Sequence, residues 1–248
     1  SIPMVGGKLV LPGPFMDGES LLEIIKAEDC NKTCAVPTVM TILLDYLDSK
    51  NLQIPSMSEI YIGGSAVPQS MIENFETKYD VNVNHGWGMT ETVVGTFNCY
   101  LPFMDELNFE QRMKIRSKQG RPPFGTEMKI VDDEGNSLPH DGIAFGKLMV
   151  RGPRVVERYY RAEESAVDSD GWFDTGDVST IDEYGFMQIT DRAKDIIKSG
   201  GEWISSVDIE NTAVGHPEVQ IAACLGVKHV KWEERPLLIV VKKEGCDP

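Results

Sequence analysis

The sequence lacks the features that mark several classes of protein. None of its apolar runs approaches the roughly 18 residues that a membrane-spanning helix needs, and its N-terminus does not show the basic-then-apolar order of a secretory signal. It contains no internal repeat and no low-complexity tract. We therefore expect a cytoplasmic protein without a transmembrane segment.

Basic residues are scarce, with 24 Lys and Arg against 39 Asp and Glu and a formal net charge of −15. Attraction to phosphate backbones and anionic lipid headgroups depends on clustered Lys and Arg. The charge balance therefore argues against nucleic acid as the main partner.

Cysteine is sparse as well, and no two cysteines form a CxxC pair. Cys30 and Cys34 are spaced to share a helix face, but no His or further Cys lies near them to complete a zinc site. We expect reduced thiols without a chemical role. The five cysteines are Cys30, Cys34, Cys99, Cys224 and Cys246.

The length of 248 residues, with 41% apolar and 25% charged side chains, is typical of globular proteins. Such a chain can form one large domain, or one domain and part of another. Either can bury a substantial core.

The first part of the chain alternates helical and strand patterns. Ser20 followed by Glu23 is a capping-box pattern that predicts a helix start, and Pro37 predicts a second one. The other elements expected here are a strand at 60–62, a helix from near Pro68 and a strand at 81–83. This alternation predicts an α/β sheet with parallel strands.

After about Lys118 the pattern changes to short strands separated by turns rich in Gly and Asp. This predicts an antiparallel, barrel-like unit. Its strands are expected at 127–131, 147–150 and 186–190. Beyond Asp191 a helix near 207–214 and strands near 219–227 and 237–241 indicate the start of a small α+β domain.

Two loops after strands are candidates for ligand binding, because loops and helix N-termini converge at the strand ends of an open α/β sheet. Gly63-Gly64-Ser65 leaves room for a flat ring against the backbone. The segment HGWGMTE at 85–91 offers an aromatic face, a hydroxyl for a phosphate and a carboxylate for Mg²⁺. Each loop, taken alone, is also compatible with an ordinary turn.

Two later segments add polar groups. FDTGD at 173–177 places a carboxylate at an expected strand start, and DRAKD at 191–195 follows the barrel-like strands. One carboxylate can accept hydrogen bonds from both hydroxyls of a ribose, and an arginine adds a donor. Singly, each segment also fits a surface turn with a salt bridge.

Four motifs together resemble one family. Gly-Gly-Ser-Ala at 63–66, HGWGMTE at 85–91, FDTGD at 173–177 and DRAKDIIKSGGEWIS at 191–205 occur in the order and approximate spacing of the acyl- and aryl-CoA synthetases. These belong to the adenylate-forming superfamily, with firefly luciferase and the adenylation domains of peptide synthetases. The resemblance runs essentially from end to end of the chain.

The resemblance implies an α/β fold that is part of an adenylate-forming enzyme. A parallel-sheet α/β subdomain with the adenine and acyl sites is expected over 1–118. An antiparallel barrel-like subdomain with the ribose site is expected over 119–192, and the hinge and truncated start of an α+β C-terminal domain over 193–248.

The resemblance also implies the residues that bind ATP or AMP. The segment Gly63, Gly64 and Ser65 matches the backbone that flanks adenine, and Trp87 the aromatic residue that stacks on it. Asp177 matches the ribose-binding aspartate and Arg192 the arginine that joins it. Thr90 and Glu91 match the catalytic pair, a threonine at the α-phosphate and a glutamate that binds Mg²⁺.

Further positions match the coenzyme A and acyl sites. Gly200 and Gly201 match the loop that lines the pantetheine tunnel, and Lys194 matches the hinge about which the C-terminal domain rotates. Val36, His85 and Met89 lie near the acyl pocket in such enzymes.

Two family segments have no counterpart in the sequence: the phosphate loop with its lysine, expected upstream, and the catalytic lysine of the C-terminal domain, expected downstream. We therefore expect the chain to be a middle fragment that is inactive by itself. Sheet edges left unpaired by missing strands favour association as a homodimer.

The expected activity is that of a medium- or long-chain fatty-acyl-CoA ligase, using a fatty acid, ATP with Mg²⁺, and CoA. HGWGMTE and the stretch KWEERP at 231–236 favour this branch. Two alternatives stay open at this point: an aryl-CoA ligase of the coumarate type, and a catalytically silent AMP-binding module.

Overall fold

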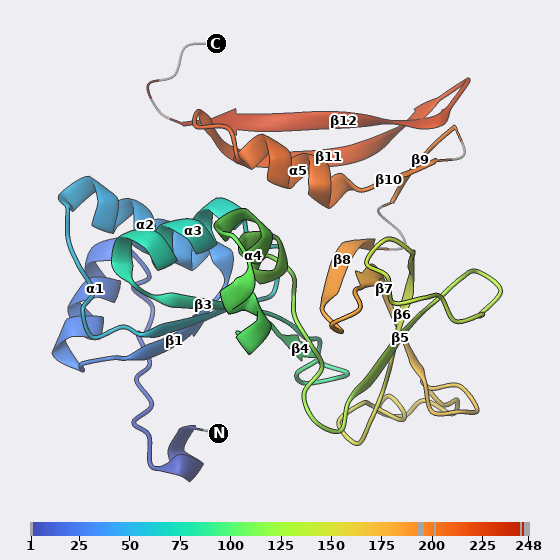
Figure 1. The fold of residues 1–248 in the computed structure, drawn as a ribbon, viewed down its shortest axis with the longest axis horizontal. Helices are drawn as coiled ribbons and strands as arrows, with labels where there is room; N and C mark the ends of the chain where they lie inside the picture. The colour runs from blue at the N-terminus through green and yellow to red at the C-terminus, as the bar shows by residue number, and fades with distance from the viewer. Residues whose placement is uncertain (1, 193–195, 201, 244, 246–248) are drawn as a thin grey trace. The chain divides into compact units, whose positions relative to one another are not determined.

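The structure, a computed structural model, describes residues 2–192, 196–200, 202–243 and 245 (Figure 1). The chain divides into two compact units, Ser1–His85 and Gly86–Pro248. The division falls within strand β3 (Asn82–Trp87). The subdomain boundaries expected after residues 118 and 192 stay predictions.

The first unit is built on a parallel sheet, as the sequence predicts. Strand β2 lies between β1 and β3, and helices connect the strands (Figure 1). The elements are η1 (Ile2–Val5), α1 (Gly18–Ala27), β1 (Lys32–Ala35), α2 (Pro37–Lys50), β2 (Glu59–Ile62) and α3 (Gln69–Tyr79). The core of the unit comes from fully buried side chains of the sheet and helices, including Leu43, Leu47, Ile60, Phe75 and Val83.

The start of α1 differs from the expected one. Asp17, not Ser20, is the N-cap residue, and its Oδ1 accepts a hydrogen bond of 2.9 Å from the backbone N–H of Ser20. Both residue types are good N-caps, so the capping-box pattern at Ser20 and Glu23 placed the helix start too late. The start of α2 is as predicted, with Pro37 in the first turn, where a missing N–H costs nothing.

The second unit begins with a short β4 (Thr96–Phe97), which pairs antiparallel with the last two residues of β3. After η2 (Pro102–Glu106) and α4 (Phe109–Arg116), four antiparallel strands follow in the order β5-β6-β7-β8. These strands are β5 (Glu127–Val131), β6 (Phe145–Arg151), β7 (Phe173–Ile181) and β8 (Met187–Arg192). Their core cluster consists of Ile130, Leu148, Val150, Phe173, Ile181 and Met187.

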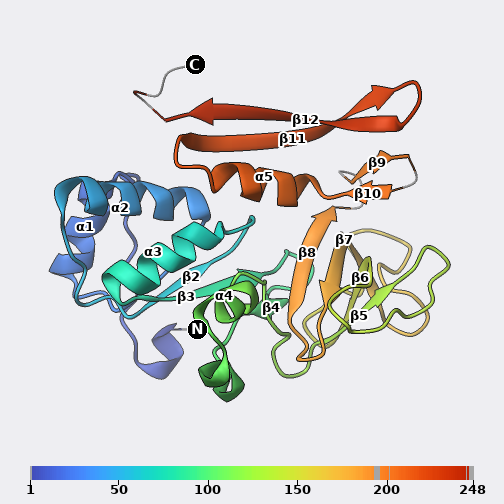
Figure 2. The same cartoon turned by 45° about the horizontal axis from the view of Figure 1, so that its top comes forward.

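The last part of the chain forms another antiparallel sheet, in the order β10-β9-β12-β11. Figure 2 shows α5 lying along the hairpin of β11 and β12. The elements are β9 (Ile197–Ser199), β10 (Glu202–Ile204), α5 (Ser206–Val214), β11 (Val219–His229) and β12 (Glu233–Lys242). The helix and the two long strands agree with the expected positions.

The hairpin of β11 and β12 exposes many apolar side chains. Leu237 to Val241, five consecutive residues of β12, are each between 41% and 52% exposed. Strand β12 pairs with β11 along its length but with β9 only at Glu233. Within the described residues, the second edge of β12 beyond Glu233 has no strand partner.

The start of α5 is tied to the end of β8. The hydroxyl of Ser205, the N-cap residue, donates a hydrogen bond to the carbonyl of Thr190, and the N–H of Ser206 donates to Oδ2 of Asp191 at 2.7 Å. A buried carboxylate at a helix N-terminus is favourable because of the helix dipole.

None of the helices in the described part of the chain is both long enough and apolar enough to span a membrane.

A nearly buried ion pair joins the segment after α4 to the turn between β7 and β8. Lys118 Nζ lies 2.6 Å from Asp182 Oδ2, and both side chains are largely buried. We expect Lys118→Met to lower the free energy of unfolding by about 2 kcal/mol, because it leaves a partly buried carboxylate without its cation. Urea unfolding checks this value, with Lys114→Met as the control.

Lys114 pairs with Glu110 at 3.1 Å on the exposed face of α4. An exposed pair of this kind contributes about 0.5 kcal/mol or less. Equal losses of stability for the two variants would contradict a special role of the Lys118–Asp182 pair.

Candidate nucleotide-binding site

The structure brings together Trp87, at the end of β3, and Asp177, on β7. The indole Nε1–H of Trp87 donates a hydrogen bond of 2.9 Å to Oδ2 of Asp177. Asp177 is only 6% exposed, so this charged acceptor is held in a protected place. The two residues that the sequence assigned to adenine and to ribose are therefore direct neighbours.

The FDTGD motif stands at a strand start, as the sequence predicted, but Asp177 itself lies further along the strand. Strand β7 begins at Phe173, and Asp177 lies in its middle, just before a register shift between Val178 and Ser179. Inside the strand, Gly176 adopts a φ of +70°. Glycine tolerates this left-handed conformation, which is more common in turns than in strands. The motif was correctly located, but it is part of a distorted strand.

Gly95 determines where the Trp87 ring can lie. A Cβ atom at Gly95 would stand 2.0 Å from Cζ3 and 2.1 Å from Cε3 of Trp87. The N–H of Gly95 also donates to the carbonyl of Trp87 at 3.0 Å. The backbone of Gly95 thus packs directly on the indole. Gly95 was not predicted from the sequence, because no local pattern identifies a glycine that contacts an aromatic ring eight positions earlier.

A tight turn follows Trp87 and presents Thr90 and Glu91. Thr92 is buried; its Oγ1 lies within hydrogen-bonding distance of both the N–H and the carbonyl of Met89. Val93, in the left-handed region with a φ of +61°, donates its N–H to the same carbonyl at 2.8 Å. As a result Thr90 is exposed and Glu91 is half-buried, while Met89 packs against the core cluster of the β5–β8 sheet.

Glu91 is held by the loop between β6 and β7. The hydroxyl of Tyr159 donates a hydrogen bond of 2.9 Å to Oε1 of Glu91, and the N–H of Val156 donates to the Glu91 carbonyl at 2.7 Å. The hydrogen bond to Glu91 raises the pKa of Tyr159, and desolvation and the nearby negative charge act in the same direction. Tyr159 was not foreseen from the sequence.

The donor set suits a nucleotide-bound magnesium ion. Mg²⁺ in proteins is held by one or two carboxylates together with substrate phosphates and waters. Within the described residues, no cluster of three or more His, Cys, Asp or Glu could hold a metal by itself. Glu91, a half-buried carboxylate beside the exposed hydroxyl of Thr90, fits an ion that arrives with phosphates.

In the first unit, the loop after β2 lies against the residue before α2. Gly64 has a φ of +91°, and a Cβ atom there would be 3.4 Å from Cγ1 of Val36. The N–H of Gly63 donates to the carbonyl of Ala35 at 3.3 Å. Val36 and Ser65 are exposed, whereas His85 is 1% exposed on β3, paired with Ile62.

The positions assigned to CoA and the hinge are described only in part. Gly200 has a φ of +63° and packs on Trp232, whose ring would lie 2.7 Å from a Cβ atom at Gly200.

Arg192 pairs with Asp177 in the register of β7 and β8, which places the two residues assigned to the ribose on adjacent strands. The side chain of Arg192, and the residues Lys194 and Gly201, lie outside the described part of the chain.

Comparison with known proteins decides the family. The sequence profile described as AMP-binding enzyme matches residues 2–160. This chain belongs to the AMP-binding enzyme family.

This AMP-binding enzyme is similar to several acyl-CoA ligases. It is 50% identical over 246 residues to a 3-methylmercaptopropionyl-CoA ligase of Ruegeria lacuscaerulensis, covering 99% of the chain and 46% of that protein. It is 49% identical over 248 residues to a medium-chain-fatty-acid–CoA ligase of Ectopseudomonas oleovorans, covering 100% of the chain and 45% of that protein. The chain thus spans about half the length of the curated relatives it matches.

The fold agrees with solved structures of adenylate-forming enzymes. The chain superimposes on o-succinylbenzoate CoA synthetase of Bacillus subtilis, in complex with an acyl-adenylate intermediate, with a TM-score of 0.76 and 28% identity. The match covers 93% of this chain and 45% of that structure. The expected fold class, an α/β part of an adenylate-forming enzyme, is confirmed.

Proposed function

We propose that the protein carrying this chain activates a fatty acid with ATP and transfers the acyl group to CoA. The observation that carries the proposal is 49–50% identity to two acyl-CoA ligases over nearly the whole chain. The contact between Trp87 and Asp177 supports it, because it joins an aromatic face and a carboxylate as adenosine recognition requires.

Each residue of the site is proposed to bind a different part of ATP. Trp87, packed on Gly95, offers its ring to adenine, and Asp177 accepts hydrogen bonds from the ribose hydroxyls, joined by Arg192. In the first unit, Gly63, Gly64 and Ser65 flank the base. Thr90 donates its hydroxyl to the α-phosphate. Glu91 would hold Mg²⁺, and the ion would supply positive charge next to the phosphates.

The reaction has two steps. An oxygen of the fatty acid carboxylate attacks the α-phosphorus of ATP, so that pyrophosphate leaves and an acyl-adenylate forms. The CoA sulfur then attacks the acyl carbonyl, and AMP leaves. In both steps the protein contributes mainly by holding the reactants in the reactive orientation. Gly200 and Gly201 are proposed to line the CoA path, and Lys194 to act as the hinge between the two steps.

The acyl substrate is proposed from the relatives. A fatty acid of medium chain length follows from the Ectopseudomonas enzyme, and Val36, His85 and Met89 are proposed to lie near its chain. A second candidate is 3-methylmercaptopropionate, a shorter thioether acid, because the Ruegeria relative is equally similar. The aryl acids of the coumarate type and a catalytically silent AMP-binding module remain the alternatives.

The proposal is tested by measuring ATP–pyrophosphate exchange with the protein that the full reading frame encodes. The acids to compare are hexanoate, octanoate, palmitate, 3-methylmercaptopropionate and coumarate. We expect the fastest exchange with an aliphatic acid and at least about 10-fold slower exchange with coumarate, since a missing apolar fit costs about 1 to 3 kcal/mol. Exchange with coumarate alone would favour the aryl ligase, and AMP binding without any exchange would favour the silent module.

Two further expectations, a cytoplasmic location and a homodimer, stay predictions. Whether the 248-residue chain is inactive by itself is decided by the same exchange experiment, performed in parallel on the chain and on the full reading frame.

A further inference from the structure

The loop between β6 and β7, which contacts Glu91, is anchored at its base. Gly152 has a φ of +155° and lies so close to the neighbouring backbone that a Cβ atom would be 2.3 Å from the carbonyl oxygen of Gly125. Arg154 donates from Nη2 to the carbonyl of Phe124 at 2.5 Å. Val155 and Val156 pack against the core cluster of the β5–β8 sheet. The base of the loop is therefore fixed on the sheet.

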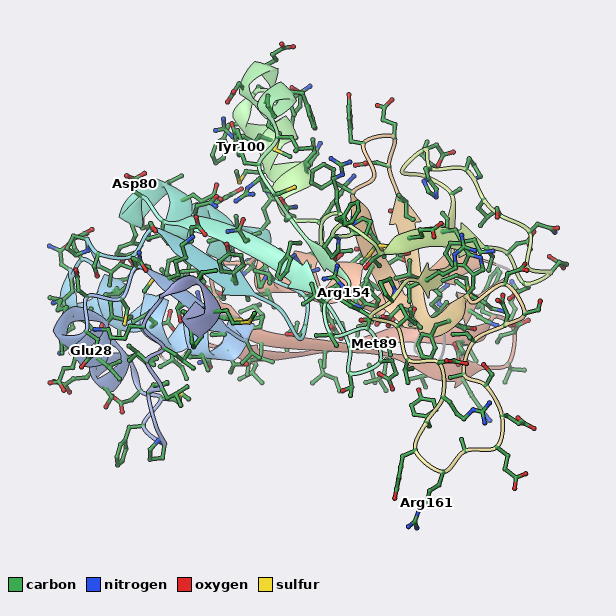
Figure 3. The ribbon with its side chains drawn as sticks, turned by 90° about the horizontal axis from the view of Figure 1, so that it is seen from below. Glu28, Asp80, Met89, Tyr100, Arg154 and Arg161 are labelled. Atoms are coloured by element: carbon green, nitrogen blue, oxygen red, sulfur yellow. The ribbon has the colours of Figure 1, made fainter. Side chains whose placement is uncertain are left out.

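The outer part of the loop carries two adjacent tyrosines in different environments. Figure 3 shows Arg161 at the outer end of this loop. Tyr160 is 88% exposed, and the guanidinium of Arg161 lies 5.1 Å from its ring centre. Tyr159 is 51% exposed and directs its hydroxyl to Oε1 of Glu91.

Glu91 is thus fixed at both its backbone and its side chain. Val156 holds the backbone carbonyl at 2.7 Å, and Tyr159 holds one carboxylate oxygen at 2.9 Å. Within the described residues, Oε1 receives this one donor and Oε2 receives none. The carboxylate therefore has one occupied and one available oxygen.

We propose that Tyr159 is a positioning residue for the metal ion of this site: its hydroxyl occupies Oε1 of Glu91 and leaves Oε2 as a single, oriented ligand for nucleotide-bound Mg²⁺. The proposal rests on the proposed function, in which Glu91 binds that ion. Mg²⁺ demands near-octahedral geometry at short distances, which a carboxylate satisfies best through one oxygen. A hydrogen bond to the other oxygen fixes the carboxylate before the ion arrives, as partners of metal ligands commonly do.

The proposed influence of Tyr159 passes through its hydrogen bond of 2.9 Å to Glu91.

Removing one hydroxyl tests the proposal, with Mn²⁺ as the probe of the metal site. In the full-length protein saturated with ATP, electron paramagnetic resonance measures the affinity for Mn²⁺. We expect Tyr159→Phe to weaken Mn²⁺ binding about 10-fold, the loss typical of a hydrogen bond to a charged group. Tyr160→Phe removes the same hydroxyl one position away and is expected to leave Mn²⁺ affinity unchanged.

A kinetic split distinguishes positioning from a general structural role. In ATP–pyrophosphate exchange, Tyr159→Phe should raise the Mg²⁺ concentration at half-saturation while the rate at saturating Mg²⁺ stays close to the wild-type rate. An equal fall in rate at every Mg²⁺ concentration would overturn the positioning role.

Glu91→Gln also separates this inference from the proposed function. If Glu91→Gln weakens Mn²⁺ binding and Tyr159→Phe does not, the positioning role of Tyr159 is wrong and the metal role of Glu91 stands. If Glu91→Gln leaves Mn²⁺ binding unchanged, the metal role of Glu91 in the proposed function fails, and the role of Tyr159 fails with it.

Discussion

Replacing Asp177 with alanine should weaken AMP binding by about 1 to 3 kcal/mol, the loss expected when polar partners are left without a charged acceptor. Two partners are affected: the proposed ribose hydroxyls, and the indole N–H of Trp87 at 2.9 Å. Because Asp177 is 6% exposed, water does not readily replace the lost acceptor. Isothermal titration of the full-length protein with AMP measures the change.

Two matched variants sharpen this prediction. Asp177→Asn keeps an oxygen that can accept from Trp87 but removes the charge, so it should fall between wild type and Asp177→Ala. Asp174 stands on the same strand, is exposed, and accepts from the N–H of Gly176 at 2.9 Å. Asp174→Ala should therefore leave AMP affinity nearly unchanged. A loss as large as that of Asp177→Ala would show that distortion of β7, and not the carboxylate, is responsible.

Gly95→Ala should be the most disruptive single-methyl change in the site. The backbone of Gly95 is not in the left-handed region, so the conflict is purely steric: the new Cβ would stand 2.0 Å from the Trp87 ring. We expect a loss of stability of about 1 to 3 kcal/mol, as in other overpacked sites. A displaced ring should also weaken AMP binding about 10-fold or more, since base stacking on an aromatic ring is worth about 1 to 3 kcal/mol.

A double-mutant cycle tests whether the Trp87 ring causes the loss of stability in Gly95→Ala. Leucine at position 87 has no atoms where Cζ3 and Cε3 of the tryptophan lie. In a Trp87→Leu background, Gly95→Ala should therefore cost less than about 1 kcal/mol of stability, which gives a clear coupling energy between the two sites. Thermal unfolding of the four proteins measures it. Additive losses would mean that Gly95 is needed for a reason other than the indole.

The parts of the fold that the sequence predicted well are those with strong local signals. Helix α2 begins at Pro37, and helix α3 follows directly on Pro68, because a proline at or just before the first turn favours a helix start. The parallel strands β2 and β3 were expected because short apolar runs alternate with these helices. Strand β1 was not expected, since Lys32–Ala35 is short and carries no alternating apolar pattern.

Local signals were also misleading where two residues could play the same part. Asp17 and Ser20 are both good caps, and only the folded helix shows which one accepts the hydrogen bond. The FDTGD segment also fitted a surface turn, whereas β7 passes through it with Gly176 in the left-handed region. Helix α4 was not expected, because it is only 8 residues long and charged residues alternate along most of it.

The site was predictable as a list of residues but not as a geometry. The motifs located Trp87, Asp177 and Glu91, and the resemblance supplied their roles. The contacts among them join positions far apart in the chain: 90 residues separate Trp87 from Asp177, and 68 separate Glu91 from Tyr159. No local pattern predicts such pairs, so Tyr159 and Gly95 became visible only in the structure.

The hairpin of β11 and β12 has a practical consequence for work with this chain. Five consecutive aliphatic residues, Leu237 to Val241, on a strand with an unpaired edge form a segment of the kind that seeds amyloid-like stacking between molecules. Charged residues flank it on both sides, Glu233 to Arg235 before it and Lys242 with Lys243 after it. Such flanking charges act as gatekeepers that keep aggregation-prone strands in solution. Salt screens those charges, so low ionic strength should be the gentler condition for purification.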